Sequence, residues 1–356
     1  MRKLAKIKNK KITKALSLVI ALILIISSFV GCGKGEEEPT TTAPTTEATT
    51  LPPVPQNVNP LTGEEGYPEE LIGNRSVLVS VENHPDARPQ WGIASADVVW
   101  ELLAEGGITR MLCMFADASR LPDKIGPTRS ARHYFVEIAE GFDSIFVHFG
   151  GSPQGYNALD NHGTNHIDGM SDSGFHRDRS RNVASEHTAY TTKDDVINNI
   201  DKKDFRTTAE EGKDKPFKFN QSPVTLSGGA CTAVSVPFSS SYTYNYTYDA
   251  ENKVYLSSLN GRDFKDDNGT QQSFTNIIIV YSSTSMIDSK RIAYDLSKGN
   301  GVYISNGTYE NITWEKGDYS DIMKFYGSDG NELSLNQGRS YIALVPTKNQ
   351  SQTTIS

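Results

Sequence analysis

The stretch IGPTRSARHYF, residues 125–135, decides how the first folded part of the chain is built. A Gly-Pro turn signal is followed by Thr128, where a helix N-cap is expected. Apolar residues then recur at helical spacing, so the sequence predicts a helix that begins directly after Thr128. Its first turn would carry Arg129, Arg132 and His133, although cations are unfavourable at a helix N-terminus. These residues therefore need a negatively charged partner.

Two kinds of partner would satisfy these cations. Arginine forks bind carboxylates or phosphates with paired hydrogen bonds, and helix N-terminal amides add donors. One hypothesis is therefore an anion pocket, and its candidate residues are Arg110, Arg129, Arg132, His133, Ser152 and Gln154. The alternative is an internal ion-pair network with Glu101, Glu105 or Asp86, which organises the fold and binds nothing. We favour the internal network, although one arginine could still remain free for a ligand.

The N-terminus has the composition of a bacterial secretion signal. Residues 1–14 carry seven basic side chains and no acidic one, and residues 15–30 are almost wholly apolar. The next residues, Phe29 to Cys32, resemble a lipobox, in which cleavage leaves a diacylglyceryl thioether on the cysteine. We therefore predict a signal peptide over 1–31 and a lipid anchor at Cys32 on the extracytoplasmic face of the cell membrane. An uncleaved anchor or a plain signal peptide are the alternatives.

A Thr/Pro-rich stretch, residues 32–60, follows the leader without any periodic apolar pattern. Such a segment cannot bury enough surface to fold, so it is predicted to be a disordered tether. Beyond residue 32 the chain carries 28 basic and 43 acidic side chains, a formal charge of −15. That charge argues against nucleic acid as a partner, because nucleic-acid binding needs a basic surface.

The remaining chain is long enough for two domains, and its composition shifts midway. We predict an α+β protein, with a layered α/β domain over 61–215, a smaller mostly-β domain over 222–347 and a tail over 348–356. In the first part, strands are expected at 76–83 and 144–150, a helix near 193–201, and a hairpin around Glu105-Gly106-Gly107. In the second part, short alternating segments separated by Gly, Asn and Asp turns suggest a small sandwich or barrel.

Two residue patterns have both a structural and a functional interpretation. Four tyrosines alternate along one strand of the second part, Tyr242, Tyr244, Tyr246 and Tyr248. They suit either cross-strand packing, which we favour, or an exposed binding platform. Cys113 and Cys231 are far apart and lack a CxxC partner, so buried apolar roles are favoured over a disulfide.

The loop NHGTNHID, residues 161–168, holds His162, His166 and Asp168, which are metal-ligand residue types. No regular element is predicted to fix their spacing, so a solvated loop is favoured over a metal site. Ser152 is a candidate nucleophile if it lies near His148 or His187. We disfavour this role because Ser152 does not lie in a GxSxG nucleophile elbow. Residues 150–154 are expected to form a loop after a strand, and the loop over 84–90 could line the same cleft as that loop. No cofactor is predicted.

Several longer motifs make the chain similar to the YerB family of bacterial lipoproteins. The matching pieces are NPLTG (59–63), NHPDARPQWGIASADVVWE (83–101), EGGITR (105–110), IGPTRSAR (125–132), VHFGGSPQ (147–154), FHRDRSR (175–181), HTAYTT (187–192), YTYD (246–249), GNGVYISNGTYENITWEK (299–316) and LNQGRSYIALVP (335–346). The resemblance implies a layered α/β part and a small β-rich part, and it implies no established catalytic activity.

These observations predict a membrane-anchored extracytoplasmic lipoprotein that binds a ligand or partner, an envelope protein or cell-wall material. The alternative is a hydrolase or transferase that acts on wall material, using His148, His166 or His187 with Arg129 and Arg132 stabilising an anion. We favour binding over catalysis, because no intact catalytic motif is present in the sequence.

Overall fold

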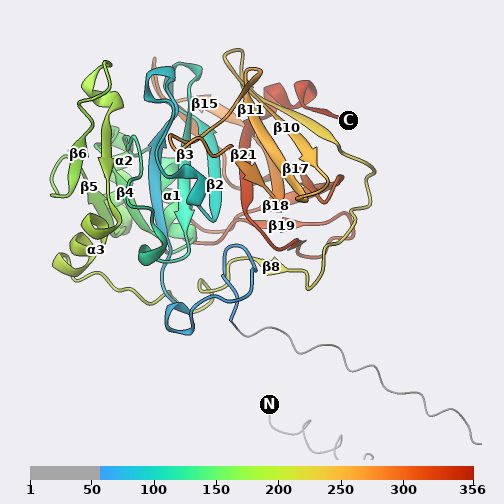
Figure 1. The fold of residues 1–356 in the computed structure, drawn as a ribbon, viewed down its shortest axis with the longest axis horizontal. Helices are drawn as coiled ribbons and strands as arrows, with labels where there is room; N and C mark the ends of the chain where they lie inside the picture. The colour runs from blue at the N-terminus through green and yellow to red at the C-terminus, as the bar shows by residue number, and fades with distance from the viewer. Residues whose placement is uncertain (1–56) are drawn as a thin grey trace, which may run out of the picture. The chain divides into compact units, whose positions relative to one another are not determined.

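The computed structural model describes residues 57–356 (Figure 1). The predicted signal peptide, Cys32 and nearly all of the predicted tether lie outside the described residues. Within 57–356, no helix is both long enough and apolar enough to cross a membrane.

A ten-stranded sheet runs through both parts of the described chain. In spatial order it consists of β19 (Lys324–Tyr326), β18 (Thr308–Glu315), β17 (Lys298–Ser305), β14 (Asn276–Ser282), β21 (Ser340–Pro346), β2 (Val98–Leu103), β3 (Thr109–Phe115), β1 (Val77–Glu82), β4 (Ile145–His148) and β5 (His166–Asp168). The two parts meet where β2 pairs in parallel with β21, in register from Val98 opposite Ser340 to Leu102 opposite Leu344. Figure 1 shows these two strands side by side, with the first part on one side and the second part on the other.

A smaller sheet is built from the second part alone. Its strands are β12 (Arg262–Asp263), β11 (Val254–Leu259), β10 (Tyr242–Asp249), β9 (Ala233–Ser239) and β22 (Thr354–Ile355), and β13 (Ser273–Phe274) pairs with β11. The two-stranded pairs are β15 (Thr284–Met286) with β16 (Ile292–Tyr294), β8 (Lys218–Phe219) with β20 (Ser334–Leu335), and β6 (Phe175–Arg177) with β7 (Ala189–Thr191). The α+β class with a mostly-β second part is confirmed, although five strands of that part extend the sheet of the first part.

Helices are few and short. The α-helices are α1 (His133–Gly141), α2 (Pro153–His162) and α3 (Lys193–Lys202). The 3-10 helices are η2 (Glu69–Leu71), η3 (Pro85–Ala87), η4 (Ile93–Ser95), η5 (Glu105–Gly107), η6 (Ala118–Arg120), η7 (Ser185–His187) and η8 (Thr347–Gln352).

The large sheet is covered on both faces. Side chains alternate between the two faces of a strand, so Trp100 and Tyr341, one residue out of register, point to opposite sides. Trp100 meets the ring of Phe142 at the end of α1, with ring centroids 5.6 Å apart. Tyr341 packs on Tyr246 of the smaller sheet, at 5.1 Å. Because both faces are buried, the central strands are almost continuously apolar rather than alternating.

The alternating tyrosines form a core and do not form an exposed platform. Tyr242, Tyr244 and Tyr246 are each 3 % exposed or less, whereas Tyr248 is only half-buried. The packing interpretation of these residues is therefore confirmed. Cys113 and Cys231 are both free and buried, as expected for small apolar residues, and burial raises the pKa of the Cys231 thiol to about 11.

The prediction that Thr128 caps the helix is wrong. Helix α1 begins at His133, and the residues before it are extended. Their backbone N–H groups bond to neighbouring segments instead of a helical turn, Thr128 to Ala189 O at 2.7 Å and Arg129 to Ser80 O at 2.9 Å. Arg129 is therefore outside the helix. Arg132 is the residue just before it, so the prediction that Arg129 and Arg132 lie in the first turn of the helix is also wrong.

A buried polar network sits on the junction of the two parts. Glu101 of β2 is fully buried, and its carboxylate accepts hydrogen bonds from Asn83 Nδ2 at 3.0 Å and from Tyr341 Oη at 2.9 Å. Tyr244 Oη of the smaller sheet lies 2.8 Å from the same Asn83 nitrogen. Burial raises the pKa of Glu101 to about 7, because the charged form loses its hydration.

This network predicts a pH dependence of stability that Glu101→Gln removes. A carboxyl whose pKa is higher in the folded state stabilises that state below about pH 4.5, and the contribution is lost as the pH rises through 7. The shift corresponds to roughly 3 kcal/mol. Urea unfolding between pH 5 and pH 8 should therefore show wild type losing stability relative to Glu101→Gln, while the exposed control Glu251→Gln follows wild type. A constant difference across this range would contradict the assignment.

Candidate functional site

A cavity of about 260 Å³ lies beside the turn that joins β2 to β3. Glu82 at the end of β1 and His84 just after it form one side, and the start of β3 forms another. Helix η7 and the extended segment before α1 complete it. The full lining is Glu82, His84, Ala104, Glu105, Ile108, Thr109, Arg110, Arg129, Glu186 and His187.

Arg110 is the basic residue of this cavity that forms no salt bridge within the described residues, although the negative charge of Glu105 opposes the lowering of its pKa. It is 7 % exposed, and its Nη1 donates to Ser130 O at 2.8 Å. Within residues 57–356, no carboxylate oxygen lies within 4.0 Å of its guanidinium. Burial, together with the charge of Arg132, lowers the pKa of Arg110 to about 9, so the side chain is still charged at neutral pH.

The other two predicted arginines are neutralised by the protein itself. Arg132 forms a bidentate ion pair with Glu105, with Nε–Oε1 at 2.5 Å and Nη2–Oε2 at 2.6 Å. Arg129 lies between Glu82, at 3.1 Å, and Glu186, at 3.3 Å. The ion-pair network thus exists and includes Glu105 as predicted. Its other acids are Glu82 and Glu186, not Glu101 and Asp86.

The opposite wall of the cavity gathers histidines and carboxylates. His187 Nδ1 lies 3.0 Å from Glu82 Oε2, and its Nε2 lies 3.6 Å from Glu186 Oε1 and 4.0 Å from Asp86 Oδ2. The ring of His84 stacks on that of His187, with centroids 4.5 Å apart. His84 Nδ1 also accepts the backbone N–H of Asp86 at 3.2 Å, which caps η3. From the loop over 84–90, His84 lines this cavity, and Ser152 does not.

Three predicted anion-pocket residues are not part of the cavity lining. Ser152 is the N-cap of α2, and its Oγ accepts the N–H of Gly155 at 3.0 Å. Pro153 occupies the first turn of that helix, where proline is tolerated, so the expected loop is a helix. Gln154 follows in the same turn. His133 starts α1, where burial and the charge of Arg132 lower the pKa of its ring, so no cation needs neutralising there.

The three metal-ligand candidates of the loop over 161–168 are not gathered at one point. His162 ends α2 and stacks on Tyr319 at 3.6 Å, whereas His166 and Asp168 lie on β5. His166 Nδ1 is 3.0 Å from Nε2 of the buried His148. Burial lowers the pKa of His148 to about 4, so it stays neutral. Asp168 accepts the N–H of Gly150 and of Met170, so its carboxylate ties two loops together.

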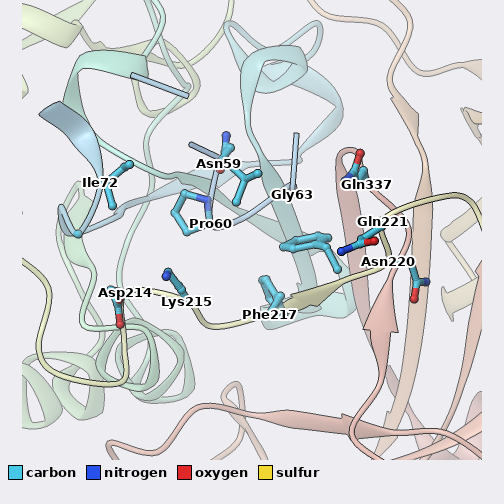
Figure 2. A pocket seen from close by; sticks show the side chains of 13 residues that line it. Asn59, Pro60, Gly63, Ile72, Asp214, Lys215, Phe217, Asn220, Gln221 and Gln337 are labelled. Atoms are coloured by element: carbon cyan, nitrogen blue, oxygen red, sulfur yellow. The ribbon is translucent and has the colours of Figure 1, made fainter. Parts of the chain in front are cut away.

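A larger cavity of about 550 Å³ lies where the described chain begins (Figure 2). Phe217 and Phe219 form much of its apolar wall, and Asn59, Pro60 and Gly63 of the NPLTG motif lie beside them. A Cβ on Gly63 would fall 2.3 Å from the Phe219 ring, so the motif is tightly packed there. Among the described residues that line it, Asp214 and Lys215 are the charged ones. Charged groups converge instead on the smaller cavity, which we take as the candidate site.

Sequence reasoning did not single out the carboxylate Glu82 or group His84 with His187. These residues are about a hundred positions apart, and only the pairing of distant segments brings them together. The available signal was the pair of motifs NHPD (83–86) and HTAYTT (187–192), which carry polar residues directly beside apolar strands.

The placement of Ser152 predicts a structural effect for Ser152→Ala. Loss of an N-cap hydroxyl leaves a helix N–H without its partner and costs about 1 kcal/mol of unfolding free energy. Urea denaturation should show this loss, whereas Ser152→Thr, which keeps a hydroxyl, should be closer to wild type. An unchanged stability of Ser152→Ala would show that the hydroxyl is not acting as a cap.

Comparisons with known proteins agree on one family. The model of the N-terminal domain of a protein of unknown function, DUF3048, matches residues 61–206, and the model of its C-terminal domain matches residues 234–342. The chain is 33% identical over 293 residues to "Putative lipoprotein YerB" of Bacillus subtilis, covering 81% of this chain and 86% of that protein. The crystal structure of YerB superposes with a TM-score of 0.73 at 31% identity, covering 84% of this chain and 99% of that one. The chain therefore belongs to the DUF3048 family and is a relative of YerB.

Proposed function

We propose that this protein is a lipoprotein held by Cys32 on the outer face of the cell membrane, where it binds a carboxylate or phosphate group of an envelope ligand. The bound group would lie in the 260 Å³ cavity against Arg110. The division into domains over 61–215 and 222–347 remains part of this proposal.

The observation that carries the proposal is the unneutralised charge of Arg110. Burying a cation without a counterion is costly, and proteins normally pair such groups. Here Glu105 is committed to Arg132 through both oxygens, and Glu82 is shared by Arg129 and His187. An anion in the cavity would supply the missing partner, and a guanidinium matches a carboxylate or phosphate with two parallel hydrogen bonds.

Binding is better supported than covalent catalysis. The residues that line the cavity include one hydroxyl, Thr109, and neither serine nor cysteine. Thr109 Oγ1 accepts a hydrogen bond from Asn83 Nδ2 at 2.7 Å, so this hydroxyl is part of the buried network around Glu101. Nothing in this arrangement activates it as a nucleophile.

Arg110→Gln tests the anion site. Free energy of ligand binding adds to stability, by about 2.7 kcal/mol at one hundred times the dissociation constant. Titrating inorganic phosphate, glycerol phosphate or acetate into the detergent-solubilised full chain should raise the Tm of wild type, with ionic strength held constant by chloride. Arg110→Gln should lose this rise while its own Tm without ligand is unchanged or higher, because a buried charge has been removed.

Arg206→Gln provides the matched control. Arg206 is ion-paired with Asp143 and does not line the cavity, so this variant should lose stability and keep the anion-dependent rise. A comparison of the three anions identifies the group that is recognised. The proposal would be wrong if no anion stabilises wild type, or if Arg110→Gln responds as wild type does.

Cys32→Ser tests the proposed anchor. If Cys32 carries the lipid, wild type expressed in Bacillus subtilis should fractionate with membranes and incorporate labelled fatty acid. The Cys32→Ser variant should incorporate none, because a hydroxyl cannot form the thioether. Cys231→Ser keeps Cys32 and should label as wild type does. Equal labelling of the two variants and wild type, or a wild-type product in the cytosol with its leader intact, would contradict the anchor.

A further inference from the structure

We propose that His84, Asp86 and His187 bind a divalent transition-metal ion of the zinc type at the edge of the charged cavity. Within residues 57–356, these three are the one set of His, Cys, Asp or Glu residues whose ligand atoms all lie within 4.8 Å of one another. Two imidazoles and one carboxylate form a donor set that suits zinc.

The distances are close to those that coordination requires. Two ligand atoms bound to one zinc ion at tetrahedral angles are about 3.4 Å apart, from bond lengths near 2.1 Å. Asp86 Oδ2 lies 3.7 Å from His84 Nδ1 and 4.0 Å from His187 Nε2. Both separations of the carboxylate from a ring nitrogen are therefore within about half an ångström of the ideal value, and the ligand atoms of all three residues lie within 4.8 Å of one another. Asp86 and His84 are 54 % and 33 % exposed at their side chains, so they have room to move.

His187 is already oriented as a metal ligand. Its Nδ1 faces Glu82 Oε2 at 3.0 Å, which leaves Nε2 available between Glu186 Oε1 at 3.6 Å and Asp86 Oδ2 at 4.0 Å. A carboxylate on the far nitrogen is the usual second partner of a metal-binding histidine, because it fixes the ring and raises the basicity of the ligating nitrogen. The side chains of Glu82 and His187 are 6 % and 7 % exposed, so this orientation is held by packing.

The charged groups around His187 also favour a cation. Glu82, Asp86 and Glu186 all approach His187, and among the arginines of the described chain Arg129 alone pairs with any of them. Three carboxylates and one guanidinium therefore surround His187, and together they carry a net negative charge. Elsewhere in the cavity lining the charged side chains are Arg110 and Glu105, and Glu105 is paired with Arg132.

One rearrangement is needed for coordination. The rings of His84 and His187 are stacked at 10° to one another, so their lone pairs do not converge on a common point. His84 must turn out of this stack and give up its 3.2 Å hydrogen bond from the Asp86 N–H. Three protein ligands would leave a fourth position for water or an anion, and both histidines line the cavity that holds Arg110.

The test is zinc binding to the detergent-solubilised full chain, free of any histidine tag, by isothermal titration calorimetry and by metal analysis after dialysis. Wild type should bind one equivalent of Zn²⁺, and Mg²⁺ should not compete at equal concentration. His84→Ala and Asp86→Asn should each weaken the affinity tenfold or more. Both residues are partly exposed, so these variants are expected to fold, which circular dichroism would verify.

His176→Ala is the matched control, because His176 pairs with Asp195 at 2.8 Å on the surface and does not line the cavity. It should bind zinc as wild type does. Zinc binding that survives both His84→Ala and Asp86→Asn, or no zinc binding by wild type, would overturn the proposal. Arg110→Gln separates the two sites, since it should lose the phosphate response and keep the zinc equivalent.

Discussion

Pairing of β2 with β21 is the constraint on which the described structure depends. It joins strands more than two hundred residues apart, and it places Glu101 between two sheets where water cannot reach it. A carboxylate in that position is tolerated only if its oxygens are bonded, and Asn83 and Tyr341 bond them from the two parts of the chain. The pairing of β2 with β21 therefore buries Glu101 and also brings Tyr341 to bond it. This makes the junction specific as well as stable.

The same network determines the shape of the candidate site. Asn83 lies between Glu82 and His84, so the residue that bonds Glu101 also sets the backbone from which two cavity side chains project. Its other contacts reinforce this, since Tyr242 Oη donates to Asn83 O at 2.7 Å and Arg88 Nε to Asn83 Oδ1 at 2.9 Å. The cavity wall is thus anchored to the core of the second part, although it consists of residues from the first. The candidate site and the junction of the two parts therefore share one set of contacts.

Local patterns in the sequence predicted local structure well. The β2–β3 hairpin, the strand before Asn83 and the helix near 193–201 follow from periodicity and turn residues, and the structure confirms them. Helix α2 was missed although its signals, Ser152 and Pro153, are local, whereas the failure at Thr128 arose because a distant segment competes for its backbone groups. Thr128 and Ser152 both precede apolar residues at helical spacing, yet only Ser152 caps a helix. The N–H of Thr128 is taken by Ala189, sixty residues away, and no local pattern reveals such a partner.

The candidate site illustrates the same limit in terms of charge. Arg110, Arg129 and Arg132 look alike in sequence, and only the fold assigns Glu105 to one, Glu82 and Glu186 to another, and no carboxylate to the third. Replacing Arg110 by an uncharged residue would relieve the cost of burying a lone cation, so its presence is not explained by stability. The buried guanidinium of Arg110, whose neighbouring carboxylates are paired with other residues, is therefore the observation on which the proposed anion site rests. That inference depends on the contrast between the three arginines, not on any one of them alone.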